Sequence, residues 1–429
     1  PSISIVLGGP EVSYETDRQS IVQYADCVIT GEAEHEFPKV CKKILSGLFP
    51  EKKIIHSQNP NLEDLKLPYN YYSSEDLAQK AVYIEASRGC PFHCEFCLSA
   101  LDESIRYFDK KVILSALDDL LRRGARHFKF VDRTFNLPSE TSKAILDFFA
   151  NSSGEGIFVH FEIVPDILSD EIKAKLQKFP PALIQLEAGV QSLNPEVCEL
   201  INRRQDCKRT LENLAFLKQR THSYIHADLV VGLPSEDLIS IAEGFDALYS
   251  LDLHEIQIGI LKRLNGAPIV KHEKDYELVF DTHAPYEILS TSTLSFHTLQ
   301  QLKRLSHVFD FISNSGNFKK TMQLLVKTRS SSFQSFLDFS NWVYLKLGRV
   351  HSVALENWCE LLFAYLVEEH DLDKSKVAEV IFYDYSRKLR YGFPKMLKRY
   401  IRNDNQDAGE AKPPKKWMPK RQQQHMNYE

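Results

Sequence analysis

Apolar and polar residues follow a regular alternation between residues 81 and 284. Short apolar runs typical of buried strands alternate there with segments whose apolar residues recur every three or four positions, as in amphipathic helices. The expected strands are residues 82–86, 127–131, 158–163, 183–188, 223–231 and 255–261, and the expected helices are 111–122, 140–149, 169–178, 195–201, 210–220 and 235–249. Strands alternating with helices indicate a parallel sheet with right-handed crossovers, and six units are too few for a closed eightfold barrel. We therefore predict an α/β fold centred on a curved, partial (β/α)6 TIM-like barrel.

Other patterns flank the predicted barrel. Residues 1–50 begin with an apolar run and a glycine turn, and continue with a second strand at 24–29 and a helix at 36–45, which is typical of the last part of a doubly wound α/β domain. Because a domain rarely starts inside its own sheet, we expect further residues before Pro1. The other expected parts are a connector (51–80), the barrel (81–284), a helical C-terminal domain (285–401, with helices near 299–313, 321–326 and 358–370) and a disordered, polar tail (402–429). Five aromatic residues of the helical part are expected to pack in its core: Phe333, Phe336, Phe339, Trp342 and Tyr344.

Composition places the chain among ordinary globular proteins. It has 429 residues, 43% of them hydrophobic and 26% charged, with a net charge of −5, so it carries no overall basic field that would favour nucleic acid. It has no apolar run of the roughly 18–20 residues that a membrane span requires, and no signal peptide. We therefore expect a cytoplasmic protein without a membrane partner.

Three of the eight cysteines lie close together, at Cys90, Cys94 and Cys97, directly after the first barrel strand. In a reducing compartment clustered thiols indicate metal ligands, and thiolates suit zinc or iron–sulfur centres. A structural zinc site needs a fourth ligand, for which His93 is the only neighbour available. Three thiolates can instead hold three irons of a 4Fe–4S cluster and leave the fourth open to a substrate, which is the reading we favour. We interpret Cys198, Cys207 and Cys359 as structural.

The motif C-x3-C-x-aromatic-C after a first strand, followed by five more strand–helix units, resembles the radical S-adenosylmethionine (SAM) superfamily. The resemblance implies a 4Fe–4S cluster on the three cysteines and SAM chelated to its open iron. An electron from the reduced cluster would cleave SAM to methionine and a 5′-deoxyadenosyl radical, which takes a hydrogen atom from the substrate. Phe96 would lie on the adenine side of SAM.

Further motifs at the ends of later strands are similar to the coproporphyrinogen-dehydrogenase-like branch of this superfamily. They are a carboxylate in the third strand, G-x-Q after the fourth, N-R one helix later, and D-L-x-x-G-L-P ending the fifth. The resemblance assigns SAM binding to Glu162, Gln191, Arg203 and Asp228, with Glu187 as a further candidate. A carboxylate suits the ammonium of SAM, an arginine its carboxylate, and an amide or aspartate its ribose hydroxyls. Arg203 and Arg204 are adjacent, and the sequence does not choose between them. The second-strand motif is Val131-Asp132-Arg133, where Asp132 or Arg133 is a candidate contact to the methionine end of SAM.

Two glycine turns of the first fifty residues, Gly8-Gly9-Pro10 and Gly31-Glu32, resemble the last third of a cobalamin-binding domain. Cobalamin is thus a second cofactor hypothesis, and the alternative is a sheet remnant that only covers the barrel. The segment after residue 285 resembles the uncharacterised domain that follows some cobalamin-type radical SAM cores.

We therefore expect a radical SAM enzyme acting on an unknown small-molecule or peptide substrate, by methyl transfer, ring formation or rearrangement. Its electron donor would be a flavodoxin or ferredoxin, and nucleic acid is not an expected partner. The alternatives are a non-catalytic iron–sulfur or zinc protein, and a relative of the tRNA-modifying methylthiotransferases. A methylthiotransferase relative would normally carry a basic RNA-binding domain and often a second cysteine cluster, and the sequence indicates neither.

Overall fold

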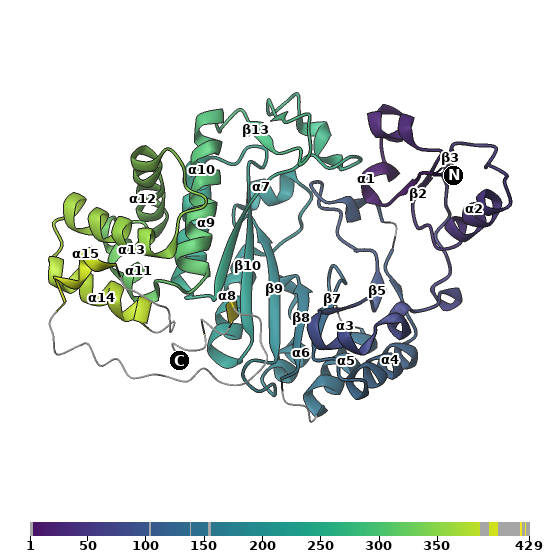
Figure 1. Cartoon of the computed structure of the whole chain (residues 1–429), viewed down its shortest axis with the longest axis horizontal. Coiled ribbons are helices and arrows are strands. Elements are labelled where there is room, and N and C mark those ends of the chain that lie inside the picture. Colours follow the sequence, from purple (N-terminus) through teal and green to yellow (C-terminus); the bar gives the residue numbers. More distant parts are fainter. Residues whose placement is uncertain are drawn as a thin grey trace.

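The chain forms three parts arranged along its long axis, with the N-terminal unit at one end, the barrel in the middle and a helical segment at the other end (Figure 1). The computed structural model describes residues 3–102, 104–137, 139–152, 156–386, 394–401, 421–422 and 425. The arrangement follows the order of the sequence, so the barrel lies between its two neighbours.

The N-terminal unit is a small parallel sheet in the order β1-β2-β3, made of β1 (Val6–Gly8), β2 (Cys27–Thr30) and β3 (Ile54–His56). Helix α2 (Glu36–Leu45) packs on one face through Val40, and the short helix α1 (Pro10–Ser13) packs on the other through Val12. Strand β3 lies inside the segment that we expected to be an irregular connector, so the sheet continues to His56. Its side chains alternate between the two faces of the sheet, with Ile54 and Ile55 in different apolar groups, which a three-residue run does not reveal from sequence alone.

The barrel is a six-stranded sheet in which every neighbouring pair is parallel and the order follows the chain, β4-β7-β8-β9-β10-β11. The strands are β4 (Val82–Ile84), β7 (His127–Phe130), β8 (Phe158–Ile163), β9 (Ile184–Gln191), β10 (Tyr224–Val231) and β11 (Glu255–Ile260). All six coincide with the predicted strands, although their ends move by up to three residues. The predicted fold class, a partial (β/α)6 barrel, is confirmed.

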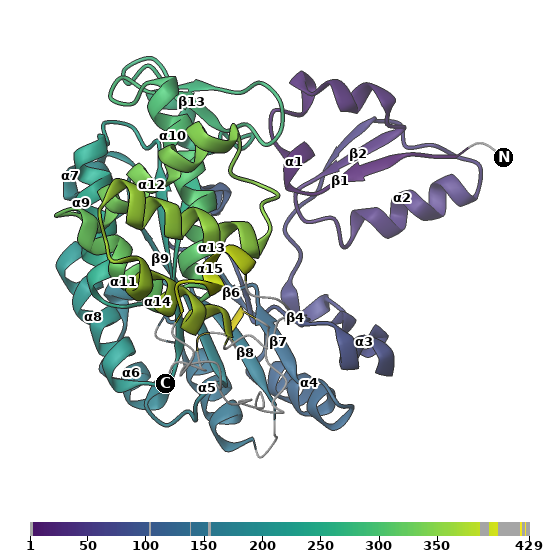
Figure 2. The ribbon, with the colours of Figure 1, turned by 60° about the vertical axis from the view of Figure 1, so that its left-hand side comes forward.

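Helices cover the outside of this sheet (Figure 2). They are α4 (Lys110–Arg122), α5 (Glu140–Asn151), α6 (Asp170–Leu176), α7 (Pro195–Leu200), α8 (Cys207–Arg220) and α9 (Leu238–Ser250). Each begins after an Asp, Ser or Asn whose side chain accepts a hydrogen bond from a backbone N–H of the first turn. Such caps satisfy N–H groups that have no partner within the helix, so they set where each helix starts.

The helical C-terminal segment packs directly on α9. It contains α10 (Phe296–Phe309), α11 (Lys319–Leu325), α12 (Ser332–Leu347), α13 (Leu355–Ala364), α14 (Lys374–Ser386) and α15 (Lys395–Lys398), with π-helical turns after α10 and α13. Phe309 and Phe336 meet Phe245 of α9 edge to face. Barrel and helical segment therefore share one continuous hydrophobic core. Phe333, Phe336 and Phe339 are buried in it, as predicted, whereas Tyr344 is exposed.

The predicted disordered tail lies largely outside the described residues. Of its described residues, Gln422 donates a hydrogen bond to Gln185 Oε1 (2.7 Å) and His425 contacts the carbonyl of Asn314 (2.6 Å). Both side chains are buried at the end of the barrel where strands β9 and β11 begin. None of the described helices is both long enough and apolar enough to cross a membrane.

Candidate functional site

The loop that carries the three cysteines, residues 89–97, leaves the barrel at the carboxyl end of β4. A two-stranded ribbon, β5 (Ser87–Arg88) with β6 (Arg106–Tyr107), closes its base. Gly89 has φ +90°, and a Cβ atom there would lie 2.3 Å from the carbonyl oxygen of Ser104. Only glycine fits this turn, so the glycine before the first cysteine is a geometric requirement of the loop.

A buried carboxylate fastens the same loop to the far side of the barrel. Glu95 lies between the second and third cysteines and is 5% exposed. Its side chain contacts His272 Nε2 (2.6 Å) and pairs with Lys271, while its backbone N–H donates to the carbonyl of Ile201 (3.0 Å). The sequence analysis did not single out these partners, because they lie more than 100 residues away.

The three thiols line one cavity of about 250 Å³, which we call the cysteine pocket. Cys94 is buried and receives a hydrogen bond from Arg203 Nη1 (3.6 Å), and Cys90 Sγ lies 3.4 Å from Thr134 Oγ1. Burial raises the pKa of Cys94, and the neighbouring guanidinium of Arg203 opposes that rise. A cationic partner at a thiol favours the thiolate form that binds metal.

The donor set fits an iron–sulfur cluster better than a single zinc ion. Within the described ranges, no three His, Cys, Asp or Glu side chains are arranged as ligands of one metal ion. His93, the only candidate for a fourth zinc ligand, contacts the carbonyl of Ala100 (3.1 Å) and does not line the pocket. Three soft thiolates around one cavity suit a cluster, in which each binds a different iron.

All of the residues assigned to SAM by the resemblance reach the same pocket. Its walls include Phe96, Glu162, Glu187, Gln191, Arg203 and Asp228, together with Arg133 and Thr134. These residues come from the cysteine loop, from the loop after β7, from strands β8, β9 and β10, and from the loop before α8. Carboxyl ends of parallel strands meet at one edge of a sheet, so residues 132 positions apart face one cavity.

Arg203 rather than Arg204 faces the pocket. Arg203 is 9% exposed, donates through Nη2 to the carbonyl of Gly189, and donates through Nε to Gln205 Oε1 (2.8 Å), whereas Arg204 is exposed. Gln191 ends β9 in the left-handed region, with φ 69°. Such strain in a residue with a side chain is typical of functional positions that the surroundings hold in place.

The three carboxylates of the pocket differ in their electrostatics. Burial raises the pKa of Glu162 to about 7, and Arg133 Nη1, 3.8 Å away, only partly offsets this. A hydrogen bond from His160 (2.8 Å) lowers the pKa of Glu187 to about 2. Burial raises the pKa of Asp228, whose Oδ1 lies 3.2 Å from His226 Nε2 in an ion-pair contact without hydrogen-bond geometry. The pocket therefore holds one carboxyl group that titrates near neutral pH, Glu162, and one that stays ionised, Glu187.

His160 and His226 are site residues that the sequence analysis missed. Each stands two positions before a predicted site residue on the same strand, Glu162 on β8 and Asp228 on β10. Glu187 lies in register with Glu162 on one side and with His226 on the other. The alternation of side chains along a strand was the available signal, because residues i and i+2 share a face.

Asp132 and Arg133, the two candidates in the second-strand motif, have different positions in the structure. Asp132 is 3% exposed and accepts hydrogen bonds from Ala86 N (3.1 Å) and the hydroxyl of Ser87, so it supports the base of the cysteine loop. Arg133 is the residue of that motif that lines the cysteine pocket. Only Arg133 therefore remains a candidate for contact with a ligand there.

A larger cavity of about 770 Å³, the interface cavity, lies between the N-terminal unit and the barrel. The N-terminal unit contributes Gly9, Gly31 and Glu32, and the barrel contributes Arg88 and Arg133. Arg88 joins the two parts by ion pairs to Glu32 and Glu34, both at 2.6 Å. Gly9 has φ +94°, and a Cβ atom there would have no neighbour within 4 Å, so its turn is open to a ligand.

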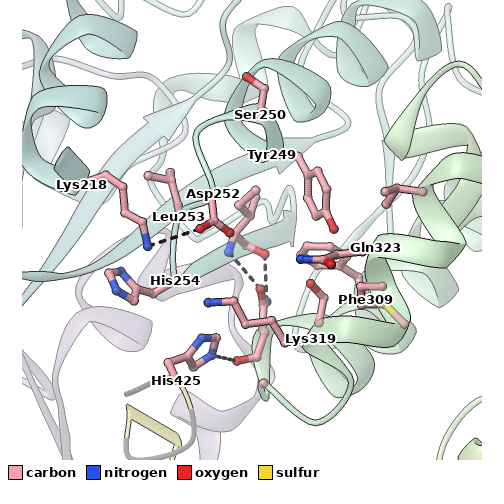
Figure 3. A pocket seen from close by; sticks show the side chains of 16 residues that line it. Lys218, Tyr249, Ser250, Asp252, Leu253, His254, Phe309, Lys319, Gln323 and His425 are labelled. Carbon is pink, nitrogen blue, oxygen red and sulfur yellow. Dashed lines mark hydrogen bonds and ion pairs between the residues drawn. The ribbon is translucent and has the colours of Figure 1, made fainter. Parts of the chain in front are cut away.

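A third cavity, of about 300 Å³, lies at the opposite end of the barrel, under the joint with the helical segment (Figure 3). Two of its polar contacts lie within the barrel, and a third connects the helical segment to the barrel. Lys218 pairs with Asp252 (3.7 Å), His254 accepts from the backbone of Ile225 (3.0 Å), and Asn314 bonds the backbone of Ile256. None of its lining residues lines the cysteine pocket, so the two cavities are separate.

The loop, the pocket and the open barrel define the class. Residues 84–248 match the radical SAM superfamily, so the chain carries a radical SAM domain. Residues 274–428 match a second family, described as a protein of unknown function (DUF4080). The predicted radical SAM class is confirmed at the level of this domain.

Several known proteins are similar over parts of the chain. An uncharacterized methyltransferase of Pyrococcus horikoshii is 22% identical over 283 residues, which cover 60% of this chain and 60% of that protein, less than two thirds of its length. Oxygen-independent coproporphyrinogen III oxidase of Paracoccus denitrificans is 28% identical over 178 residues, 38% of each chain.

Among solved structures, the cobalamin-dependent S-adenosylmethionine radical enzyme OxsB, with aqua-cobalamin and SAM bound, has a TM-score of 0.55. The match covers 92% of this chain and 67% of that one at 14% identity. At such an identity the likeness concerns the fold alone.

Proposed function

We propose that this protein cleaves SAM reductively and passes the resulting radical to a substrate bound at the carboxyl ends of the barrel strands. The observation that carries the proposal is the cysteine pocket, in which three thiols and six predicted SAM contacts face one cavity. A non-catalytic metal protein would have no need for the polar residues opposite its cysteines.

Cys90, Cys94 and Cys97 are the proposed ligands of the cluster. When bound and reduced, the cluster supplies the electron that cleaves SAM to methionine and a 5′-deoxyadenosyl radical. Arg203 would bind the SAM carboxylate, Glu162 would accept from the amino group, and Gln191 and Asp228 would hold the ribose hydroxyls. Phe96 would pack against the adenine. The electron donor we propose is a flavodoxin or ferredoxin, in the cytoplasm.

We propose cobalamin as a second cofactor and methyl transfer as the favoured reaction. The interface cavity supports this, since two glycine turns and Arg88 border an open space that shares Arg133 with the cysteine pocket. The name of the Pyrococcus relative and the cofactor of OxsB point the same way. Bound cobalamin would supply a methyl-carrying cobalt. The proposed substrate remains a small molecule or peptide, and the net charge of −5 argues against a nucleic acid.

The test of SAM cleavage uses anaerobically reconstituted protein. We expect about four irons and four sulfides per chain, and 5′-deoxyadenosine on addition of SAM and dithionite. Cys94→Ala should lose both, while the control Cys41→Ala, on α2 and away from the pocket, should keep both. A cluster that never yields 5′-deoxyadenosine would refute the proposal.

The cobalamin proposal has its own test. Hydroxocobalamin should co-elute with the protein on gel filtration and change its visible spectrum on binding. Arg88→Gln should weaken cobalamin binding, because it replaces a residue that lines the interface cavity and removes its ion pair with Glu32. Absence of binding would leave the N-terminal unit as a cover for the barrel.

A further inference from the structure

Two cysteines outside the cluster loop come together beside the cysteine pocket. Cys198 lies in α7, and Cys207 is the first residue of α8. Cys198 Sγ donates to the carbonyl of Ser192 (3.4 Å), and the two thiols are close enough for each to affect the ionisation of the other. Nine positions separate them in the sequence, which is why the sequence alone gave no reason to pair them.

The turn between them brings the thiols together and also carries Arg203. The backbone N–H of Arg203 donates to the carbonyl of Cys198 (2.8 Å). Gln205 accepts from Arg203 Nε, donates to the carbonyl of Ser192 (3.0 Å) and reaches Cys207 Sγ (4.0 Å). One amide side chain thus touches both the second thiol and the guanidinium that faces the cysteine pocket.

The two thiols differ in access and in acidity. Cys198 is 2% exposed, whereas Cys207 borders an open groove of about 620 Å³ between α7, α8 and α9. The hydrogen bond from Cys198, with a smaller contribution from Gln205, lowers the pKa of Cys207 to about 7, and the same contact and burial raise the pKa of Cys198. The accessible sulfur is therefore the better nucleophile and the buried one keeps its proton.

We propose that Cys207 and Cys198 form a reactive dithiol that exchanges with low-molecular-weight disulfides and controls the position of Arg203. The Cys207 thiolate attacks one sulfur of the small disulfide, forming a mixed disulfide and releasing one thiolate. The Cys198 thiol then attacks the Cys207 sulfur, closing a Cys198–Cys207 disulfide and releasing the second thiol. The protein loses two electrons, which reduce the small disulfide to two thiols, and the proton of Cys198 goes to a leaving sulfur.

Closing that disulfide moves Cys207 Sγ, which Gln205 contacts at 4.0 Å, and we expect Gln205 to move with it. Arg203 then loses its Nε acceptor next to the pocket. This second part rests on the proposed function, since it takes Arg203 as the SAM carboxylate partner. The dithiol chemistry itself does not depend on that function.

The experiment treats anaerobic, cluster-loaded full-length protein with oxidised glutathione, followed by alkylation and a non-reducing tryptic digest. Trypsin cuts after Arg203 and Arg204, so the disulfide appears as two linked peptides. We expect this product in the wild type, a lasting glutathione adduct on Cys207 in Cys198→Ser, and no adduct on Cys198 in Cys207→Ser. Reaction of Cys207 with iodoacetamide should rise with pH around 7. If Cys198 and Cys207 both remain free thiols in the wild type, or if the wild type forms only the mixed disulfide, the proposed dithiol reaction is wrong.

The coupling is read separately, as SAM affinity measured by equilibrium dialysis. We expect oxidation to weaken SAM binding at least threefold in the wild type, dithiothreitol to restore it, and Cys207→Ser to be indifferent to glutathione disulfide. A linked peptide with unchanged SAM affinity would overturn the control of Arg203. Failure of the reduced enzyme to cleave SAM would instead concern the proposed function and would leave the peptide result intact.

Discussion

Arg203 is the residue on which most of the site converges. Its guanidinium contacts the thiol of Cys94, the carbonyl of Gly189 and the side chain of Gln205, and still lines the cysteine pocket. A planar, always charged group can hold three fixed acceptors and present its remaining donors to a carboxylate, which a lysine cannot do.

Arg203→Lys should therefore raise the KM for SAM roughly tenfold or more, since a charge-assisted hydrogen bond contributes about 1.5–3 kcal/mol. The matched control is Arg204→Lys, whose side chain is exposed and should leave the KM unchanged. Formation of 5′-deoxyadenosine at varied SAM concentrations measures both. Equal effects of the two variants would contradict the assignment.

Glu162 is expected to make SAM binding pH-dependent. Because burial raises its pKa to about 7, the carboxyl is largely protonated in the free protein at pH 6 and ionised at pH 8. An ionised carboxylate is the better acceptor for the amino group of SAM, so the affinity should rise as pH increases through about 7. SAM binding measured by dialysis between pH 6 and 7.5 tests this, and Glu162→Gln should flatten the profile. An equally steep profile in that variant would assign the dependence to another group.

At the scale of elements, contacts with other parts of the barrel hold the cysteine loop in position. Asp132 supports its base, Glu95 ties its middle to the loop after β11, and Gly89 allows the turn that starts it. A loop held at three points can present three thiols to one cavity before any cluster binds.

Gly89→Ala should remove this preorganisation. The left-handed φ costs an alanine about 1–3 kcal/mol, and its Cβ would collide with the backbone of Ser104. We expect iron incorporation to fall by more than half. Gly124→Ala is the matched control, because that glycine also has positive φ (102°) but an added Cβ meets no atom within 4 Å. Iron per chain after reconstitution compares the two, and equal loss would point to general misfolding.

At the scale of the molecule, the barrel and the helical segment form one core. Phe336 of α12 packs against Phe245 and Tyr249 of α9 and Phe309 of α10. An unfolding event that starts in either part therefore exposes the surface of the other.

Phe336→Ala should lower the free energy of unfolding by about 3–5 kcal/mol, because it leaves a cavity where barrel and helical segment meet. Trp342 and Trp358 report on the helical segment by fluorescence, and far-UV circular dichroism reports on the whole chain. Both signals should shift together to lower denaturant concentration. A shift of the fluorescence alone would contradict a shared core.

Local patterns predicted much of this molecule. The six barrel strands, the helices between them and the cysteine loop followed from apolar periodicity and motif spacing, because a strand or helix records its buried face in its own residues. The family resemblance also named the six side chains that now line the cysteine pocket with the three thiols.

Other features depended on contacts between distant residues. Strand β3, the shared core, the anchors of Glu95 and the choice of Arg203 over Arg204 have no local signature. The i, i+2 spacing places His160 and His226 on the strand faces of Glu162 and Asp228, but only packing shows which carboxylates they contact. The pairing of Cys198 with Cys207 is of the same kind, since the turn that joins them depends on Ser192 and on the end of β9. By itself the sequence determined the elements and the chemical class of the site. Only the tertiary structure decided which side chains meet, because burial and proximity arise when the elements pack together.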